Sequence, residues 1–193
     1  MEPRKLKGKK ERPSLTQEKQ EIPEKSKYPV YFDLRNYIRW QPPKSQGYCG
    51  ASWAFAAVGS LEGFWGKNKL GIPGTTFSEQ QLINCDSNNQ GCKGGSTIIT
   101  WAYVKDKEGL TTEKFLPYIA NKEVCTHHKD HSVISIDDFQ LFYENEDAMA
   151  REIYLTGPMA HSFKVIPDEF VFYQSGIYES DPCRDGAGSA THD

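Results

Sequence analysis

The segment SWAFAAVGSLEGFWGK, residues 52–67, constrains the fold of this chain more than any other. It is apolar nearly all the way around a helix, and such a helix belongs in the middle of a domain, covered on every side. The preceding residues 28–47 are extended and rich in turns, and Pro42 and Pro43 exclude a helix there. We therefore expect one domain built around a central helix that begins at Ser52 and ends near Lys67.

Three further helices and three strands are predicted around this helix. Ser78 opens a helix over SEQQLIN, where Gln81 completes a capping-box pattern. TIITWAYVKDK (97–107) indicates a helix ended by Gly109, and EDAMAREIYL (146–155) indicates another. SVISIDDFQLFY, PMAHSFKVI and FVFYQSGIY have the composition of strands. Helices first and strands later predict an α+β fold with two sub-domains.

Charge and hydropathy exclude several classes of protein. Residues 1–27 hold nine Lys/Arg and five Glu with little to bury, so we expect a disordered, solvated basic tail. The net charge is −3, so the rest of the chain carries −7, which argues against a nucleic-acid-binding body. No apolar run reaches the length of a membrane span, and no apolar core of a signal peptide follows Met1.

The five cysteines indicate an oxidising compartment. They are too numerous and too scattered for a chance set in a reduced protein, and they lack the close-set pairs of most zinc sites. His127, His128 and His131 leave a metal cluster conceivable near one of them, but we favour a solvated polar loop and predict no metal. The cysteines are Cys49, Cys85, Cys92, Cys125 and Cys183.

The start of the central helix is the candidate site. A side chain in the first turn lies at the positive end of the helix dipole, beside N–H groups that have no intrahelical acceptor. Ser52 has this position, and Gly50 and Ala51 before it are small enough to admit a substrate. Gln46 could donate its amide to the same point, giving a two-donor oxyanion hole. On residue types alone, the favoured alternative is a helix cap at Ser52 and a simple loop amide at Gln46.

The wider motifs reverse that preference. FDLRNYIRWQPPKSQGYCGASWAFAAVGSLEG resembles the active-site segment of papain-like cysteine peptidases, whose motif runs QGxCGSCWAF. FSEQQLINCDSNNQGCKGG resembles that family's SEQxLxxC…GCxGG block, and GPMAHSF…FVFYQSGIY is similar to its GPV…FxxYxxGIY. The resemblance implies a papain-like two-lobed domain over 28–193. A helical lobe would span about 40–130, and an antiparallel β-barrel-like lobe over about 131–193 would be incomplete.

The resemblance also implies roles for single residues. Gln46 matches the oxyanion-hole glutamine and His192 the catalytic histidine, with His161 as the weaker candidate. Gly94 and Gly95 match cleft glycines whose backbone pairs with an extended peptide, like an added strand.

Further residues take structural or bordering roles by the same resemblance. Trp53 borders the substrate-binding region and mainly packs. Cys49 with Cys92, and Cys85 with Cys125, match two family disulfides, and Cys183 matches half of a third. Candidates for the walls of the main specificity pocket are Thr97, His161 and Ser162.

Three features depart from the family. Ser52 stands where the family has its nucleophilic Cys, and an alcohol is too weak an acid to form a thiolate–imidazolium pair. His192 lies between Thr191 and Asp193, where the family usually has Asn or Asp before this histidine and a small residue after it. We also expect the domain to be truncated before the segment that supplies the family's orienting Asn, and to lack the usual signal peptide and prodomain.

These observations leave three hypotheses. The first is a papain-like peptidase whose hydrolysis is impaired or absent, and the second is a pseudoprotease that binds peptides without cleaving them. The third is a silicatein-like protein, since CGAS is similar to silicateins, although those have Tyr where Trp53 stands. The implied partners are an extended polypeptide and a protein inhibitor in the cleft, bound by a monomer without cofactor. The family's lysosomal, vacuolar or extracellular location agrees with the cysteines.

Overall fold

The structure is a computed structural model that describes residues 4–6, 28–106, 109–143, 145–165, 172–176, 178 and 190–192. Within these residues the helices are α1 (Ser52–Lys67), α2 (Glu79–Cys85), α3 (Thr97–Asp106) and α4 (Glu146–Leu155), with short 3₁₀ helices η2 (Leu34–Asn36) and η3 (Lys129–His131). The strands are β1 (Arg4–Leu6), β2 (Ile134–Ile136), β3 (Phe163–Val165) and β4 (Ala190–His192). This mixture confirms the predicted α+β class.

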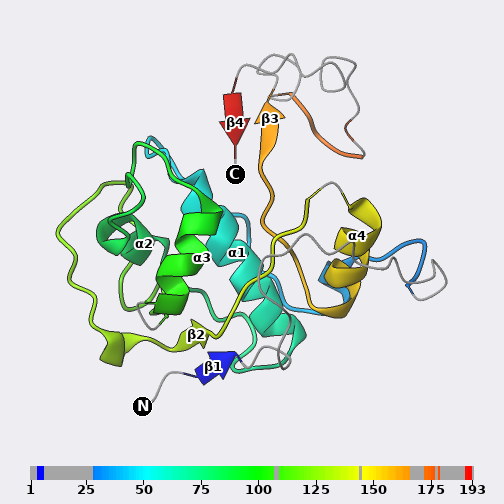
Figure 1. Cartoon of the computed structure of the whole chain (residues 1–193), viewed down its shortest axis with the longest axis horizontal. Coiled ribbons are helices and arrows are strands. Elements are labelled where there is room, and N and C mark those ends of the chain that lie inside the picture. Colours follow the sequence, from blue (N-terminus) through cyan, green and yellow to red (C-terminus); the bar gives the residue numbers. More distant parts are fainter. Residues whose placement is uncertain are drawn as a thin grey trace.

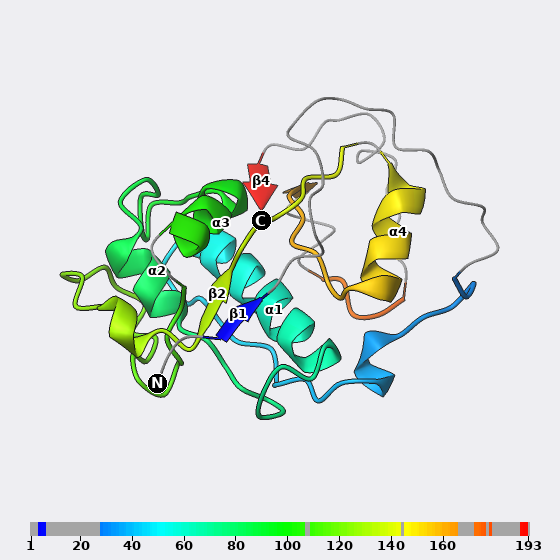
Figure 2. The same cartoon turned by 60° about the horizontal axis from the view of Figure 1, so that its bottom comes forward.

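Helix α1 lies at the centre, as its composition predicts (Figure 1). Helices α2 and α3 both pack against it, whereas α4 lies apart from these three in both views (Figures 1 and 2). Because α1 must be covered on several sides, its neighbours contribute a shared apolar core. Buried members of this core are Trp53, Ala54, Val58, Leu61, Trp65, Phe77, Leu82, Ile83, Tyr103, Val104, Leu110 and Ile134.

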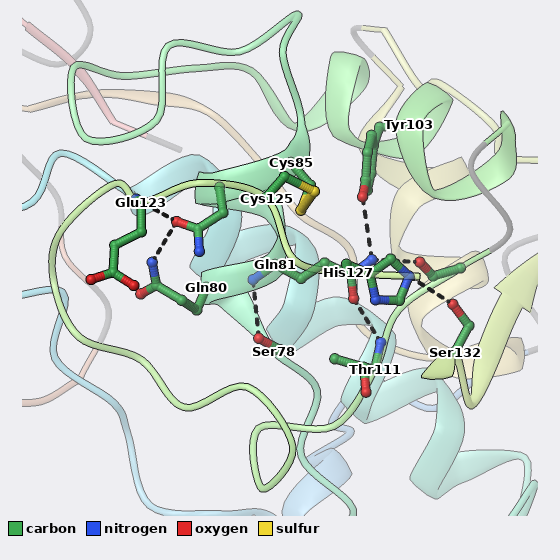
Figure 3. The surroundings of a disulfide bond; sticks show 12 residues. Ser78, Gln80, Gln81, Cys85, Tyr103, Thr111, Glu123, Cys125, His127 and Ser132 are labelled. Carbon is green, nitrogen blue, oxygen red and sulfur yellow. Dashed lines mark hydrogen bonds between the residues drawn. A yellow bond between two sulfur atoms is a disulfide. The ribbon is translucent and has the colours of Figure 1, made fainter. Parts of the chain in front are cut away.

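The predicted capping box of α2 forms only in part. Ser78 Oγ accepts a hydrogen bond from Gln81 N–H at 3.0 Å, as expected of an N-cap. The Gln81 side chain does not return to the Ser78 N–H, which donates to the Thr111 carbonyl instead. Instead, the Gln81 side chain donates from Nε2 to the Gly109 carbonyl at 2.9 Å, and its Oε1 accepts from the Thr111 N–H at 2.7 Å (Figure 3). A buried glutamine thus joins α2 to the segment after α3.

The strands are shorter than the sequence predicts. Within 132–143 only β2 forms, because its ladder partners are limited to β1, in parallel, and a single antiparallel bridge from Leu110. In the described part of the predicted strand 158–166, residues 158–165, only β3 forms, antiparallel to β4. The predicted strand 170–178 does not form in its described part, because residues 172–176 and 178 are in turns or irregular structure. Apart from β1, the predicted basic tail lies outside the described residues.

Candidate active site

Ser52 is the first residue of α1 and is half-buried. Ala51 precedes it as N-cap and provides no side-chain cap, so the first N–H groups of the helix are left to other partners. Among the described residues, no acceptor for the Ser52 N–H is recorded. A negative charge that develops beside Ser52 would therefore meet both a free donor and the positive end of a 16-residue helix.

The loop before α1 is fastened to the loop after α2. The Cys49–Cys92 disulfide joins residues 43 apart in sequence, and the Gly50 N–H donates to the Cys92 carbonyl at 2.9 Å. A Cβ on Gly50 would lie 2.8 Å from that carbonyl oxygen, so only glycine permits this approach. The implied pairing of Cys85 with Cys125 is also present (Figure 3), which confirms both implied disulfides. Cys183 lies outside the described residues.

Gln46 is half-buried in the turn before this disulfide. Its backbone carbonyl accepts from the Tyr118 hydroxyl at 2.6 Å and from the Cys49 N–H at 3.4 Å. Its side-chain amide has no hydrogen-bond partner within the described part of the chain, so it is available to a ligand. The backbone of Gln46 is thus fixed by hydrogen bonds, while its side-chain amide has none within the described residues.

The two cleft glycines differ in what their backbones can offer. Gly94 uses both of its groups within the loop, since its N–H donates to the Gly91 carbonyl and its carbonyl accepts from the Gln90 N–H. Gly95 is exposed, and no backbone partner is recorded for it among the described residues. Gly95, rather than Gly94, therefore has the free edge that an extended peptide needs.

Trp53 supports this glycine from beneath. Its side chain is 1% exposed, and its Nε1–H donates to the Gly91 carbonyl at 3.2 Å. A Cβ on Gly95 would lie 2.7 Å from Trp53 Cδ2 and 2.6 Å from Asn89 Oδ1, so the packing requires glycine. The substrate-binding role assigned to Trp53 is therefore indirect, because a buried indole cannot touch a ligand.

The two candidate histidines belong to the β3–β4 region. His192 is the last residue of β4, where its backbone pairs with Phe163 of β3, and the exposed His161 lies two residues before β3. In both views this strand pair lies toward the N-terminal end of α1 (Figures 1 and 2). Of the proposed pocket-wall residues, Ser162 is exposed and Thr97 is buried at the start of α3.

Sequence reasoning missed a charged cluster next to Gln46. The Lys44 ammonium lies 3.3 Å from Glu62, 2.7 Å from Glu79 and 3.1 Å from Glu113. Although burial lowers the pKa of Lys44, attraction to these carboxylates raises it overall. Lys44 therefore stays charged and joins the loop before α1 to both helices and to the segment after α3.

The carboxylates of this cluster share one cation, which changes their pKa values. Glu79 is 1% exposed, and burial together with the nearby Glu113 carboxyl raises the pKa of Glu79 to about 8. Although burial raises the pKa of Glu113, its bonds to Glu79 and Lys44 lower it overall. Glu79 and Glu113 therefore hold one proton between them at neutral pH.

The histidines after Cys125 act as members of a polar loop. His127 Nε2 lies 3.1 Å from Ser132 Oγ (Figure 3), and His128 Nδ1 lies 3.1 Å from Asp130. Burial, then the neighbouring His131 and His128, lower the pKa of His127. Across the described ranges, no group of three or more His, Cys, Asp or Glu residues is placed to hold a metal ion. Within the same ranges, no helix has the length and apolarity to cross a membrane.

Comparison with known proteins gives concordant matches. Residues 28–192 match the family described as papain family cysteine protease. Testin-2 of Mus musculus is 38% identical over 159 residues, covering 81% of this chain and 47% of its own length. Cathepsin L2 of Homo sapiens is 34% identical over 166 residues, covering 80% and 48%.

A solved structure agrees with these matches. The digestive procathepsin L2 proteinase from Tenebrio molitor larval midgut superposes with a TM-score of 0.75 at 28% identity, covering 86% of this chain and 53% of that one. The chain spans about half the length of the curated relatives it matches.

Proposed function

The chain belongs to the papain family of cysteine proteases, and we propose that it keeps the family's peptide-binding site while its peptide hydrolysis is strongly impaired. The observation that carries this proposal is the position of Ser52. It is the first residue of the central helix, locked beside the Cys49–Cys92 disulfide, where a nucleophile would have both a helix dipole and free donors.

Replacing a thiol by an alcohol at this position changes the first chemical step. A cysteine with a lowered pKa attacks as a preformed thiolate. Ser52 Oγ would have to lose its proton to a base, proposed here as His192, while its bond to the peptide carbonyl carbon forms. The resulting oxyanion would be bound by the Ser52 N–H and the Gln46 amide. We expect this step to be slow, because an alcohol needs tight alignment with its base.

Peptide binding does not depend on the Ser52 side chain. A Cβ on Gly95 would meet Trp53 and Asn89 first, so these two side chains, and not the Ser52 hydroxyl, lie nearest its free backbone edge. An extended polypeptide could pair with that edge as an added strand. This observation favours, as the second candidate, a pseudoprotease that binds peptides without cleaving them. The two disulfides support formation in the oxidising lumen of the endoplasmic reticulum, as expected of a secreted or lysosomal protein.

The test compares the unaltered chain with its Ser52→Cys variant on a fluorogenic dipeptide, at mildly acidic pH with too little reductant to open the disulfides. Activity that appears only in Ser52→Cys supports the proposal. Equal activity in both chains contradicts the argument about the alcohol. Binding of an extended peptide, followed by fluorescence anisotropy, separates the two candidates. If neither chain cleaves while both bind peptide, and Gly95→Ala abolishes binding, the pseudoprotease remains.

A further inference from the structure

We propose that the segment 113–118, called here the bracket, fixes the position of Gln46, with Tyr118 as a positioning residue for the oxyanion hole. Its catalytic meaning rests on the proposed function, whereas its structural claim stands on contacts that do not involve Ser52 Oγ. The bracket lies beyond α3 in sequence, yet it holds Gln46 on both flanks.

Tyr118 connects the two sources of oxyanion donors. Its hydroxyl donates to the Gln46 carbonyl at 2.6 Å. Its ring lies edge-on to Phe55, with centroids 4.9 Å apart and an interplanar angle of 85°. Phe55 is on α1, three residues after Ser52, so one side chain spans from the Ser52 turn to Gln46. Tyr118 therefore links the backbone of Gln46 to the first turn of α1, and these are the two elements that carry the proposed donors.

Glu113 secures the other flank of Gln46. Its Oε2 accepts from the Lys44 ammonium at 3.1 Å, two residues before Gln46. Its Oε1 accepts from the Tyr118 N–H at 3.3 Å, within the bracket itself. The Glu113 carboxylate thus links Lys44, just before the Gln46 turn, to Tyr118, which bonds to Gln46 itself.

The bracket is itself anchored to the start of α2. Ser78 Oγ donates to the Leu116 carbonyl at 2.7 Å, and the Glu113 N–H donates to the Thr76 carbonyl at 3.1 Å. Just beyond the bracket, Ile119 N–H donates to Gln80 Oε1 at 3.0 Å. Ser78, the N-cap of α2, and Gln80 on α2 (Figure 3) are both buried, so the bracket packs against the core.

Removing the Tyr118 hydroxyl should loosen Gln46 specifically. The only other recorded bond to the Gln46 carbonyl, within the described residues, is the long one from Cys49 N–H. Misplacement of a catalytic group by an ångström costs roughly a hundredfold in rate, and loss of a whole oxyanion donor costs about as much or more. We expect a partial loss from Tyr118→Phe, about tenfold in kcat with KM nearly unchanged.

The first experiment needs no activity. Amide hydrogen exchange is measured on the chain with Ser52 intact, for Tyr118→Phe and for Tyr103→Phe as the matched control. Tyr103 also has a hydroxyl that bonds to a glutamine, Gln81 Nε2, but on α3. Faster exchange at Cys49 and Gly50 in Tyr118→Phe alone supports the bracket. No acceleration there, or equal acceleration in the control, overturns it.

The second experiment measures kcat and KM in the Ser52→Cys background, with and without Gln46→Ala. If Tyr118 acts through Gln46, Tyr118→Phe lowers kcat when Gln46 is present and causes no further loss in Gln46→Ala. An equal loss in both backgrounds overturns the positioning role. If the Ser52→Cys chain has no activity, the peptidase proposal fails, and the exchange experiment alone decides whether the bracket holds Gln46.

Discussion

The shared proton of Glu79 and Glu113 predicts an unusual dependence of stability on pH. The pKa of Glu79 is raised from its ordinary value of 4.5 to about 8, by burial and by the nearby Glu113 carboxyl. Between these values the folded chain holds a proton that the unfolded chain has lost. The free energy of unfolding contributed by Glu79 is therefore complete below pH 4.5 and is lost as pH rises toward 8.

The size of the effect follows from the slope. A difference of one bound proton changes the free energy of unfolding by about 1.4 kcal/mol per pH unit. Between about pH 5.5 and 7.5 the Glu79 contribution should thus fall by about 3 kcal/mol. Glu113 adds no slope in this range, because a carboxyl with a lowered pKa is ionised in both the folded and unfolded chains.

The substitution Glu79→Gln tests this reasoning, because Gln copies the protonated acid. Its oxygen can still accept from Lys44, and its amide can donate to Glu113. Urea unfolding at several pH values should give a steeper fall of stability with pH in the unaltered chain than in Glu79→Gln. His127, whose lowered pKa gives a slope of opposite sign, cancels in this difference. Asp138→Asn, at an exposed carboxylate, serves as control and should leave the slope unchanged. Parallel curves for the unaltered chain and Glu79→Gln would refute the shared proton.

Two further predictions concern stability alone. Replacing both Cys85 and Cys125 with Ser opens a crosslink between residues 40 apart, which should lower the free energy of unfolding by about 4 kcal/mol in the chain-entropy model. If urea unfolding shows that the free energy of unfolding falls by less than 1 kcal/mol, the unfolded chain remains compact without the Cys85–Cys125 disulfide. Gly59→Ala should raise stability by about 0.5–1 kcal/mol, because Gly59 is inside α1 and an added Cβ meets nothing within 4 Å. A fall in the melting temperature would contradict this expectation.

Local pattern predicts the helices because their causes are local. The apolar run from Ser52 to Lys67 fixes α1, and the predicted segment 146–155 coincides with α4, capped by Asn145. The strands are overestimated, because a ladder needs a partner and composition does not provide one. β2 has ladder partners only at three residues, and its sequence neighbours Asp137 and Asp138 are exposed.

The site is predictable only where a motif extends over it. Family motifs indicated Ser52, Gln46 and both disulfides, and the disulfides are confirmed. The Lys44 cluster has no such signal, because its three carboxylates lie 18, 35 and 69 residues away in sequence. The bond from Tyr118 to Gln46 spans 72 residues. Such contacts arise from tertiary packing of segments that carry no shared local pattern.

The cluster of Lys44 and its three glutamates supports a positioning role for these residues better than a purely stabilising one. Glu79 is almost fully buried and has its pKa raised to about 8, so its ionised form is disfavoured where it lies. Well-packed apolar residues can often take the place of a buried polar group beside a charge without loss of stability, because the cost of desolvation offsets the electrostatic attraction. Apolar side chains cannot make hydrogen bonds, whose preferred distances and angles fix the relative positions of the groups they join. Lys44 reaches three separate elements, and each bond fixes where the loop before Ser52 begins.

None of the bonds of Lys44 involves the Ser52 hydroxyl, so a change from thiol to alcohol leaves the placement of Gln46 intact. The Ser52→Cys substitution therefore tests the nucleophile separately from the structure that holds its oxyanion donors.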